Sequence, residues 1–242
     1  MSWLKPLRRI WLLWALPFGL VWTVFMTLMT IFYSLSRLPN LHAVPRFWAR
    51  ILALGLGCPV AARGMENLAR GQAFVFACNH SSAMDIPALQ AVLPSNFRWM
   101  AKKELFEIPI FGAGLRACGY IPVDRSDHRE AIKSLKEAAA RIREGASVVI
   151  FPEGTRSTDG ALLPFKKGGF RLATEAGAPL VPVAIVGAFK AWPAGTFDIF
   201  PHCAEVRFGD PIPTAGLGRE ELKSLPERVR EQVRELMERD RD

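Results

Sequence analysis

The chain has 242 residues, of which 50% are hydrophobic and 22% are charged, and its formal net charge is +8. This composition excludes an intrinsically disordered protein and a collagen-like repeat. The length is sufficient for one large domain or two small ones, with a core that needs no disulfide for stability.

The N-terminal segment is apolar and carries no charged residue from Ile10 to Ser36. A membrane-spanning helix needs about 20 apolar residues, whereas the apolar core of a cleaved signal peptide has only about 7 to 15. We therefore predict an uncleaved membrane anchor in residues 1–60. Basic residues flank the apolar run on both sides, so the positive-inside rule gives no orientation. The anchor is either one spanning helix or a helical hairpin whose second arm is Pro45 to Leu56.

Residues 61–242 alternate between short strand-like and longer helix-like segments. This alternation predicts an α/β fold with a mixed, largely parallel sheet flanked by helices. The short segments are rich in β-branched or aromatic residues and are bounded by Gly, Pro or Asn. The six expected strands are Ala73 to Cys78, Phe97 to Ala101, Gly119 to Val123, Ser147 to Phe151, Pro179 to Ile185 and Ala204 to Phe208.

Two of the expected helices are clearly amphipathic. Asp127 to Glu144 places Ile132, Leu135 and Ile142 on one face, and charged residues cover the other. Arg219 to Asp242 combines an apolar stripe with acidic and basic residues in near balance. The positive excess of the chain therefore belongs to the anchor and to the body before this tail.

Metal-ligating residue types show no clustered spacing. The cysteines have no C-x-x-C pair, and the histidines are scattered, so we predict no metal site. We expect the cysteines to be reduced and mostly buried, as in a protein that faces the cytosol. These residues are Cys58, Cys78, Cys118 and Cys203, and His42, His80, His128 and His202.

Polar clusters follow three of the predicted strands. In open α/β sheets, ligands bind at the carboxyl ends of the strands, so the three clusters can converge on one site. The clusters are Asn79 to Asp85, Asp124 with Arg125, and Pro152 to Ser157.

His80 and Asp85 have the residue types of a general base and its partner. On one regular helix a spacing of five residues would point them about 140° apart. If His80 instead lies in a strand-to-helix turn and Asp85 begins the helix, the carboxylate can fold back to the imidazole and stabilise its protonated form. The chain has no G-x-S-x-G nucleophile elbow, so such a base would activate a hydroxyl of the substrate. The alternative is a helix-capping aspartate beside a core histidine.

Basic residues at the same edge of the sheet predict a phosphate site. Guanidinium groups match phosphate oxygens in a bidentate manner, and small residues leave backbone N–H groups accessible to an anion. Glu153, beside them, is suited to anchor an arginine or to hold a polyol hydroxyl. Taken singly, each cation is alternatively a solvated surface charge. The candidate residues are Arg125, Arg156, Lys102 and Lys103, with Gly154 and Thr155 as the small residues.

These motifs resemble the four ordered sequence blocks of the glycerolipid acyltransferases, in particular those of the bacterial 1-acyl-sn-glycerol-3-phosphate acyltransferases. The similarity extends from about Arg63 to about Pro213. A lone H-x4-D pair would be weak evidence, whereas the full Phe-Pro-Glu-Gly-Thr-Arg-Ser string is highly specific. The blocks are Asn79-His80-x4-Asp85, Gly119-Tyr-Ile-Pro-Val-Asp-Arg125, Phe151-Pro-Glu-Gly-Thr-Arg-Ser157 and Val181-Pro-Val-Ala-Ile185.

Two positions depart from the pattern of the family. Pro122 stands where an aromatic or aliphatic residue is usual, which predicts an edge strand or an interrupted one. Ser81 stands where glutamine is frequent. Neither position carries a group with a proposed chemical role.

The resemblance implies that residues 61–242 form a glycerolipid acyltransferase catalytic domain. It implies His80 as the base, Asp85 as its partner, and acceptor binding by Arg125, Glu153, Gly154 and Arg156. The acceptor would be lysophosphatidic acid and the donor an acyl thioester on coenzyme A or acyl carrier protein, giving phosphatidic acid with no tightly bound cofactor. We expect the anchor to hold the domain on the cytoplasmic face of the inner membrane, where a basic surface favours anionic lipids.

Other functions remain to be separated from this one. The same acyl transfer could act on another lysophospholipid or on a lyso-aminolipid. A membrane-tethered nucleic-acid-binding protein would also be basic, but the aromatic residues concentrate in the anchor and no nucleic-acid motif is present. A non-catalytic lipid-binding relative is disfavoured because His80, Asp85, Glu153 and Arg156 are all intact.

Overall fold

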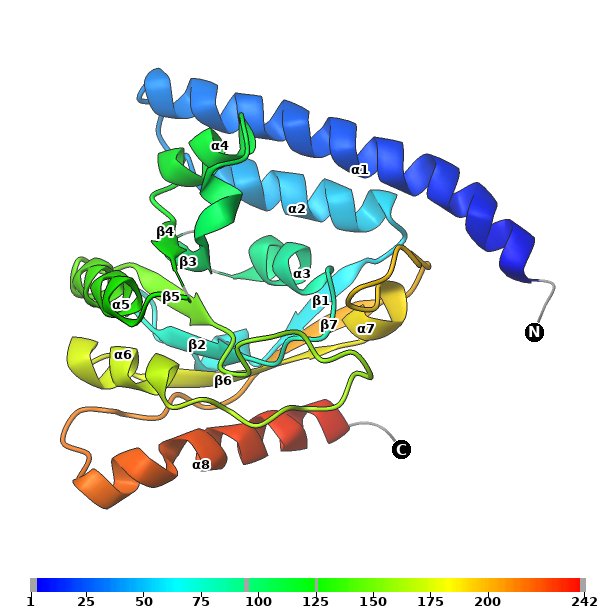
Figure 1. Cartoon of the computed structure of the whole chain (residues 1–242). Helices are drawn as coiled ribbons and strands as arrows, with labels where there is room; N and C mark the ends of the chain where they lie inside the picture. Colours follow the sequence, from blue (N-terminus) through cyan, green and yellow to red (C-terminus); the bar gives the residue numbers. More distant parts are fainter. Residues whose placement is uncertain (1–3, 94–95, 125, 240–242) are drawn as a thin grey trace.

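The computed structural model describes residues 4–93, 96–124 and 126–239. A seven-stranded sheet lies between two layers of helices (Figure 1). The strands are β1 (Val60–Arg63), β2 (Val75–Cys78), β3 (Phe97–Lys102), β4 (Ile121–Val123), β5 (Ser147–Ile150), β6 (Leu180–Val186) and β7 (Ala204–Phe208). The helices are α1 (Leu4–Leu35), α2 (Ala43–Gly55), α3 (Asp85–Val92), α4 (Phe111–Ala117), α5 (His128–Arg143), α6 (Gly168–Ala176), α7 (Ala188–Ala191) and α8 (Arg219–Glu238), with short 3-10 turns η1 (Met65–Asn67) and η2 (Lys103–Phe106).

The sheet is mixed and largely parallel, as the sequence predicts. Its strand order is β1-β7-β6-β2-β5-β3-β4. The five strands from β6 to β4 run parallel, β7 pairs antiparallel with β6, and β1 pairs parallel with β7. The carboxyl ends of β2, β5 and β3 therefore lie side by side at one edge.

Alternation along β2 explains why helices cover both faces of the sheet. Phe76 and Cys78 belong to a core shared with α2 and α3. Val75 and Ala77 belong to a second core shared with α5, α6 and α8. Because successive side chains of a strand point to opposite faces, a strand buried on both sides needs a helical layer on each.

All six expected strands are present, and a seventh was missed. Strand β1 is short, and three of its four residues are exposed. Its sequence therefore lacks the alternation of buried and exposed side chains that marks a strand. Its pairing partner β7 lies far along the chain. Strand β4 is at the edge of the sheet and contains the exposed Pro122, as the departure from the family pattern predicts.

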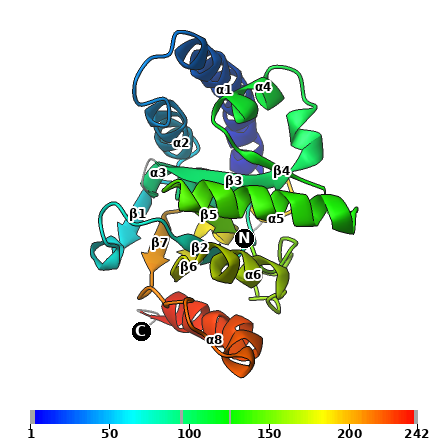
Figure 2. The same cartoon turned by 90° about the vertical axis from the view of Figure 1, so that its left-hand side faces the viewer.

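The N-terminal segment forms two packed helices. The apolar stretch Ile10–Leu35 of α1 is long and apolar enough to cross a membrane, by length and composition. Helix α2 packs against α1 on one side and against α3 on the other. Figure 2 shows α1 lying between α2 and α4, so the apolar helix runs along the helical layer above the sheet.

Candidate active site

His80 and Asp85 meet in the turn between β2 and α3. Asp85 is the first residue of α3, and its Oδ2 lies 2.8 Å from His80 Nδ1. The same oxygen accepts the backbone N–H groups of Ser81 and Ser82, each at 2.8 Å. The carboxylate folds back from the start of the helix to the histidine, as the spacing argument requires.

The imidazole of His80 is held in orientation by an aromatic stack. The centroid of its ring lies 3.9 Å from that of Phe151 at an interplanar angle of 15°, and Trp99 also stacks on Phe151. Only 17% of the His80 side chain is exposed, and Asp85 is fully buried. When Nδ1–H donates to the carboxylate, Nε2 is the nitrogen that can accept a proton, and Asp85 stabilises the resulting imidazolium.

Glu153 holds the backbone of His80. It follows β5 and is 97% buried, and its Oε1 accepts the His80 N–H at 2.7 Å. Its Oε2 accepts the N–H of Leu163 at 3.0 Å. Ser157 donates its N–H to the His80 carbonyl at 2.8 Å. Both backbone groups of His80 are thus bonded to the loop that follows β5.

Burial raises the pKa of the Glu153 carboxyl to about 7, although the amides of His80 and Leu163 act in the opposite direction. The sequence suggested an arginine or a polyol as the partner of this residue. Its described hydrogen bonds are instead to backbone amides of this chain. A contact between Glu153 and the acceptor stays a prediction.

The loop after Glu153 presents a small basic surface. Thr155 and Arg156 are exposed, and Gly154 has a φ of 75°. A Cβ at Gly154 would lie 2.7 Å from Nζ of Lys166, so the missing side chain leaves room for that lysine against the loop. Sequence analysis did not assign Lys166 to the site.

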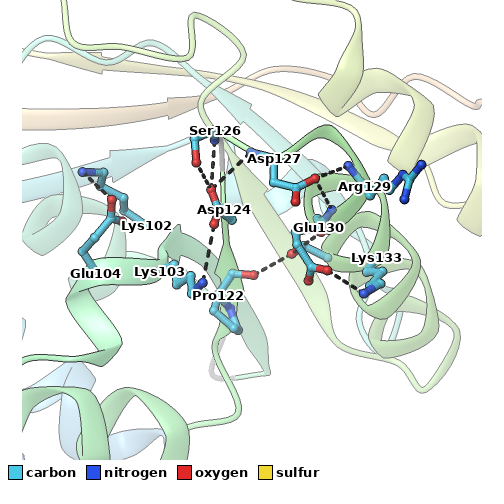
Figure 3. A network of polar contacts seen from close by, with 11 residues as sticks. Lys102, Lys103, Glu104, Pro122, Asp124, Ser126, Asp127, Arg129, Glu130 and Lys133 are labelled. Carbon is cyan, nitrogen blue, oxygen red and sulfur yellow. Dashed lines mark hydrogen bonds and ion pairs between the residues drawn. The ribbon is translucent and has the colours of Figure 1, made fainter.

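The other predicted cations lie toward the edge of the sheet and pair with acids (Figure 3). Lys102 lies 2.9 Å from Glu104, and Lys103 lies 3.5 Å from Asp124. Hydrogen bonds from the hydroxyl and amide of Ser126 lower the pKa of Asp124 to about 2. The described contacts do not bring either lysine to His80, and Arg125 lies outside the described residues.

Asn79 forms a buried clamp that sequence analysis did not identify. Its Nδ2 donates to the carbonyl of Ile185 at 3.1 Å, and its Oδ1 accepts the N–H of Ile185 at 2.7 Å. Strand β2 ends at Cys78, so the side chain of Asn79 takes over the hydrogen bonds that the strand would have made with β6. The only signal in the sequence is its position directly before His80.

Comparison with known proteins identifies the family of the chain. The sequence profile of the family described as Acyltransferase matches residues 59–186. The chain belongs to the acyltransferase family.

Relatives of this acyltransferase include plant enzymes. A protein of Brassica napus, named 1-acyl-sn-glycerol-3-phosphate acyltransferase BAT2, chloroplastic, is 36% identical over 66% of the chain and 46% of its own length. A 1-acyl-sn-glycerol-3-phosphate acyltransferase of Cocos nucifera is 32% identical over 87% of the chain and 68% of its own length. The chain therefore matches less than half of the Brassica relative.

A solved structure shares the whole fold with this acyltransferase. The crystal structure of the 1-acyl-sn-glycerophosphate (LPA) acyltransferase PlsC from Thermotoga maritima superposes with a TM-score of 0.82 and 27% identity. The match covers 96% of this chain and 97% of the other. The similarity therefore includes the helices before the sheet as well as the α/β body.

An apolar cavity lies beside the aromatic stack of the acyltransferase. Residues of α1, α2, α3 and α4 form most of its wall, together with Trp99 of β3. Gln90 is a polar residue in this wall. Its Oε1 accepts hydrogen bonds from Trp99 Nε1 at 2.8 Å and from the Tyr120 hydroxyl at 3.1 Å. Trp99 connects this cavity with the stack on His80.

A second apolar groove adjoins this cavity and shares Thr23, Trp48 and Ile86 with it. The groove also reaches Ala83, in the turn that carries His80 and Asp85.

Among the described residues, no group of three or more His, Cys, Asp or Glu side chains could hold a metal ion. Cys58, Cys78 and Cys118 are buried, as expected, whereas Cys203 is exposed.

Proposed function

We propose that the chain transfers a fatty acyl group from an acyl thioester to the sn-2 hydroxyl of lysophosphatidic acid, giving phosphatidic acid. The observation that carries this proposal is the 2.8 Å contact between His80 Nδ1 and Asp85 Oδ2, which leaves Nε2 as a base at the carboxyl edge of the sheet. The names of the relatives support the acceptor, since the matched proteins are 1-acyl-sn-glycerol-3-phosphate acyltransferases.

In the proposed reaction, Nε2 of His80 takes the proton of the acceptor hydroxyl as the oxygen attacks the thioester carbonyl. Backbone N–H groups stabilise the resulting oxyanion. The intermediate then collapses, the carbon–sulfur bond breaks, and the thiolate leaves with the proton that His80 returns. Asp85 stabilises the imidazolium while it exists, and no acyl-enzyme forms.

The exposed loop after Glu153 is suited to the acceptor phosphate. Arg156 supplies a guanidinium fork beside the small residues Gly154 and Thr155, and Lys166 lies against Gly154. Lys102 ends the neighbouring strand β3 and Lys103 follows it; we propose that both leave their acidic partners Glu104 and Asp124 to assist in binding the phosphate. We propose that Arg125, next in the chain after Asp124, contributes in the same way.

The apolar cavity is suited to an acyl chain. It is lined mainly by apolar side chains, and Trp99 joins it to the His80 stack. We propose acyl-CoA or acyl carrier protein as donor, with no tightly bound cofactor and no nucleic-acid partner.

We place the protein at the inner membrane with its catalytic domain on the cytoplasmic face. The apolar helix α1 supports the membrane location. The exposed thiol of Cys203 suits a reducing compartment and supports the cytoplasmic face.

The test is acyl transfer by the purified full chain in lipid vesicles. Lysophosphatidic acid, a lysophosphatidylcholine and a lyso-aminolipid serve as acceptors, and acyl-CoA and acyl carrier protein thioesters as donors. We expect lysophosphatidic acid to be preferred and His80→Ala to lower kcat at least about 100-fold. The matched control is His202→Ala, which removes an exposed histidine in the loop before β7. A folded His80→Ala protein with near-normal turnover would contradict the role of His80, and preference for another lysolipid would contradict the acceptor.

A further inference from the structure

Exposed apolar side chains cluster at one place outside α1 and α2. Leu105, in η2, is 38% exposed, and in the turn between η2 and α4 Ile108 is 46% exposed and Ile110 45%. Elsewhere in the described body, large exposed apolar residues occur singly, at Ile132, Phe197 and Leu222. Single exposed residues are ordinary, whereas a local cluster points to a partner surface.

The backbone of this turn is strained at an exposed residue. Ile110 has φ 66° and ψ −59°, and the N–H of Phe111 donates to the carbonyl of Pro109 at 2.7 Å. This is a classic γ-turn, which is rare, and a β-branched residue with positive φ is an outlier. The side chain of Ile110 is nearly half exposed, so packing within the protein compensates little for the strain.

The turn is nevertheless rigidly built. Gly112 donates to the carbonyl of Ile108 at 2.8 Å, and Gly114 donates to that of Ile110 at 3.0 Å. A Cβ at Gly112 would lie 2.0 Å from the carbonyl oxygen of Phe106, so this close return of the chain requires glycine. The fold thus holds Ile108 and Ile110 outward in a fixed arrangement.

The position of the turn identifies what it contacts. Helix α4 packs directly on α1, because a Cβ at Gly114 would lie 2.6 Å from Cγ2 of Thr27. Figure 2 shows α4 beside α1 on the side opposite α2. Phe25 and Leu28 on α1 are also exposed, so two elements in contact with each other, α1 and the segment that leads into α4, both present apolar side chains to the outside.

We propose that the Ile108–Ile110 turn inserts into the lipid bilayer as a second membrane contact beside α1. Ile108, Pro109 and Ile110 carry no charge, and the exposed Glu107 and Arg116 flank them at headgroup depth. Transfer of the isoleucines into lipid supplies the apolar burial that the protein does not provide. Because Phe111, Gly114 and Leu115 line the apolar cavity, this contact fixes one wall of the cavity against the bilayer.

This inference rests on membrane association through α1 and not on the acyl-transfer reaction. It is tested with the full chain carrying Cys203→Ser, which removes the exposed thiol. A single cysteine is introduced at Ile108, labelled with the environment-sensitive dye NBD, and examined in vesicles of phosphatidylethanolamine and phosphatidylglycerol. Lipids with doxyl groups on their acyl chains serve as quenchers.

Two matched positions calibrate the dye. Phe25→Cys on α1, at a residue that is 50% exposed, reports whether α1 is in contact with the membrane. Ile132→Cys on α5, at a residue that is 40% exposed, reports the signal of the dye on the helical layer at the other face of the sheet. We expect blue-shifted emission and doxyl quenching at positions 25 and 108, and neither at 132. Quenching at 25 without quenching at 108 would overturn the proposal. Absence of quenching at both positions would remove the membrane association on which it rests. A blue shift at 108 that persists without lipid and is not quenched would assign the turn to a protein partner.

A second measurement does not depend on the dye. Ile108→Asp should weaken partitioning into the same vesicles on the order of 10-fold, because an apolar side chain no longer enters the lipid. Ile132→Asp replaces an equally exposed isoleucine on α5 and should leave partitioning unchanged. Equal partitioning of the two variants would also overturn the proposal.

Discussion

Glu153 accepts a hydrogen bond of 2.7 Å from the backbone N–H of His80, although 73 residues separate the two along the chain. Since Ser157 bonds the carbonyl of the same histidine, the loop after β5 fixes the backbone that carries the proposed base. Asp85 then orients the ring from the other side. The position of His80 therefore depends on two separate segments, and only one of them is local in sequence.

The titration of Glu153 should be visible in the stability of the protein. Burial raises the pKa of its carboxyl in the folded state to about 7, above the ordinary value of 4.5. Between these two pH values the folded state binds a proton that the unfolded state lacks, so stability falls as pH rises through this window. Glu153→Gln should remove up to about 1.4 kcal/mol per pH unit of that slope.

The slope can be measured by thermal unfolding in detergent micelles from pH 4.5 to 8. Glu107→Gln, at an exposed glutamate, is the control and should leave the pH dependence of the wild type intact. Parallel curves for the wild type and Glu153→Gln would show that the carboxyl does not titrate in this range.

The amide clamp of Asn79 should contribute strongly to stability. Asn79→Ala leaves the buried N–H and carbonyl of Ile185 without their described partner, and each such group costs about 1–3 kcal/mol. We expect a loss of about 2–4 kcal/mol in the free energy of unfolding, measured with urea in detergent micelles. Asn67→Ala, which removes an exposed contact with Asp210, should cost far less. Similar losses for the two variants would contradict the importance of the clamp.

Local sequence patterns predicted the His80–Asp85 pair only as one of two alternatives, the other being a helix-capping aspartate beside a core histidine. The structure places Asp85 at the start of α3, from where its carboxylate reaches back to His80 in the turn after β2. The same reasoning located six strands and both amphipathic helices, because their apolar patterns are local.

The partners of Glu153 and Asn79 could not be predicted in this way. Both bond to backbone groups, which leave no trace in residue identity. The amide of His80 lies 73 residues from Glu153, and Ile185 lies 106 residues from Asn79. The acidic partners of Lys102 and Lys103 were missed for a related reason. Glu104 and Asp124 were visible in the sequence, but only the pairing of β3 with β4 brings Asp124 to Lys103.

Arg156 should affect the acceptor far more than the donor. It is exposed on the loop that presents Gly154 and Thr155, and a guanidinium–phosphate pair contributes about 1.5–3 kcal/mol. Arg156→Ala should therefore raise the KM for lysophosphatidic acid at least about 10-fold, with little change in the KM for acyl-CoA. Arg171→Ala on α6, another exposed arginine, should change neither constant. Equal losses for both substrates would indicate damage to the fold instead of a lost phosphate contact.

The apolar cavity should set the length of acyl chain that the enzyme accepts. Leu115 of α4 lines this cavity, so Leu115→Trp should shorten the space for the chain. Each methylene excluded from an apolar site costs about 0.8 kcal/mol, and loss of two should lower kcat/KM on the order of 10-fold for long-chain donors. Assays with acyl-CoA donors of increasing length measure this change, and Ile132→Trp, on the opposite layer, is the control. Short-chain donors should retain near wild-type rates with Leu115→Trp, because they leave the narrowed end of the cavity empty. An equal loss at every chain length would mean that the acyl chain lies elsewhere.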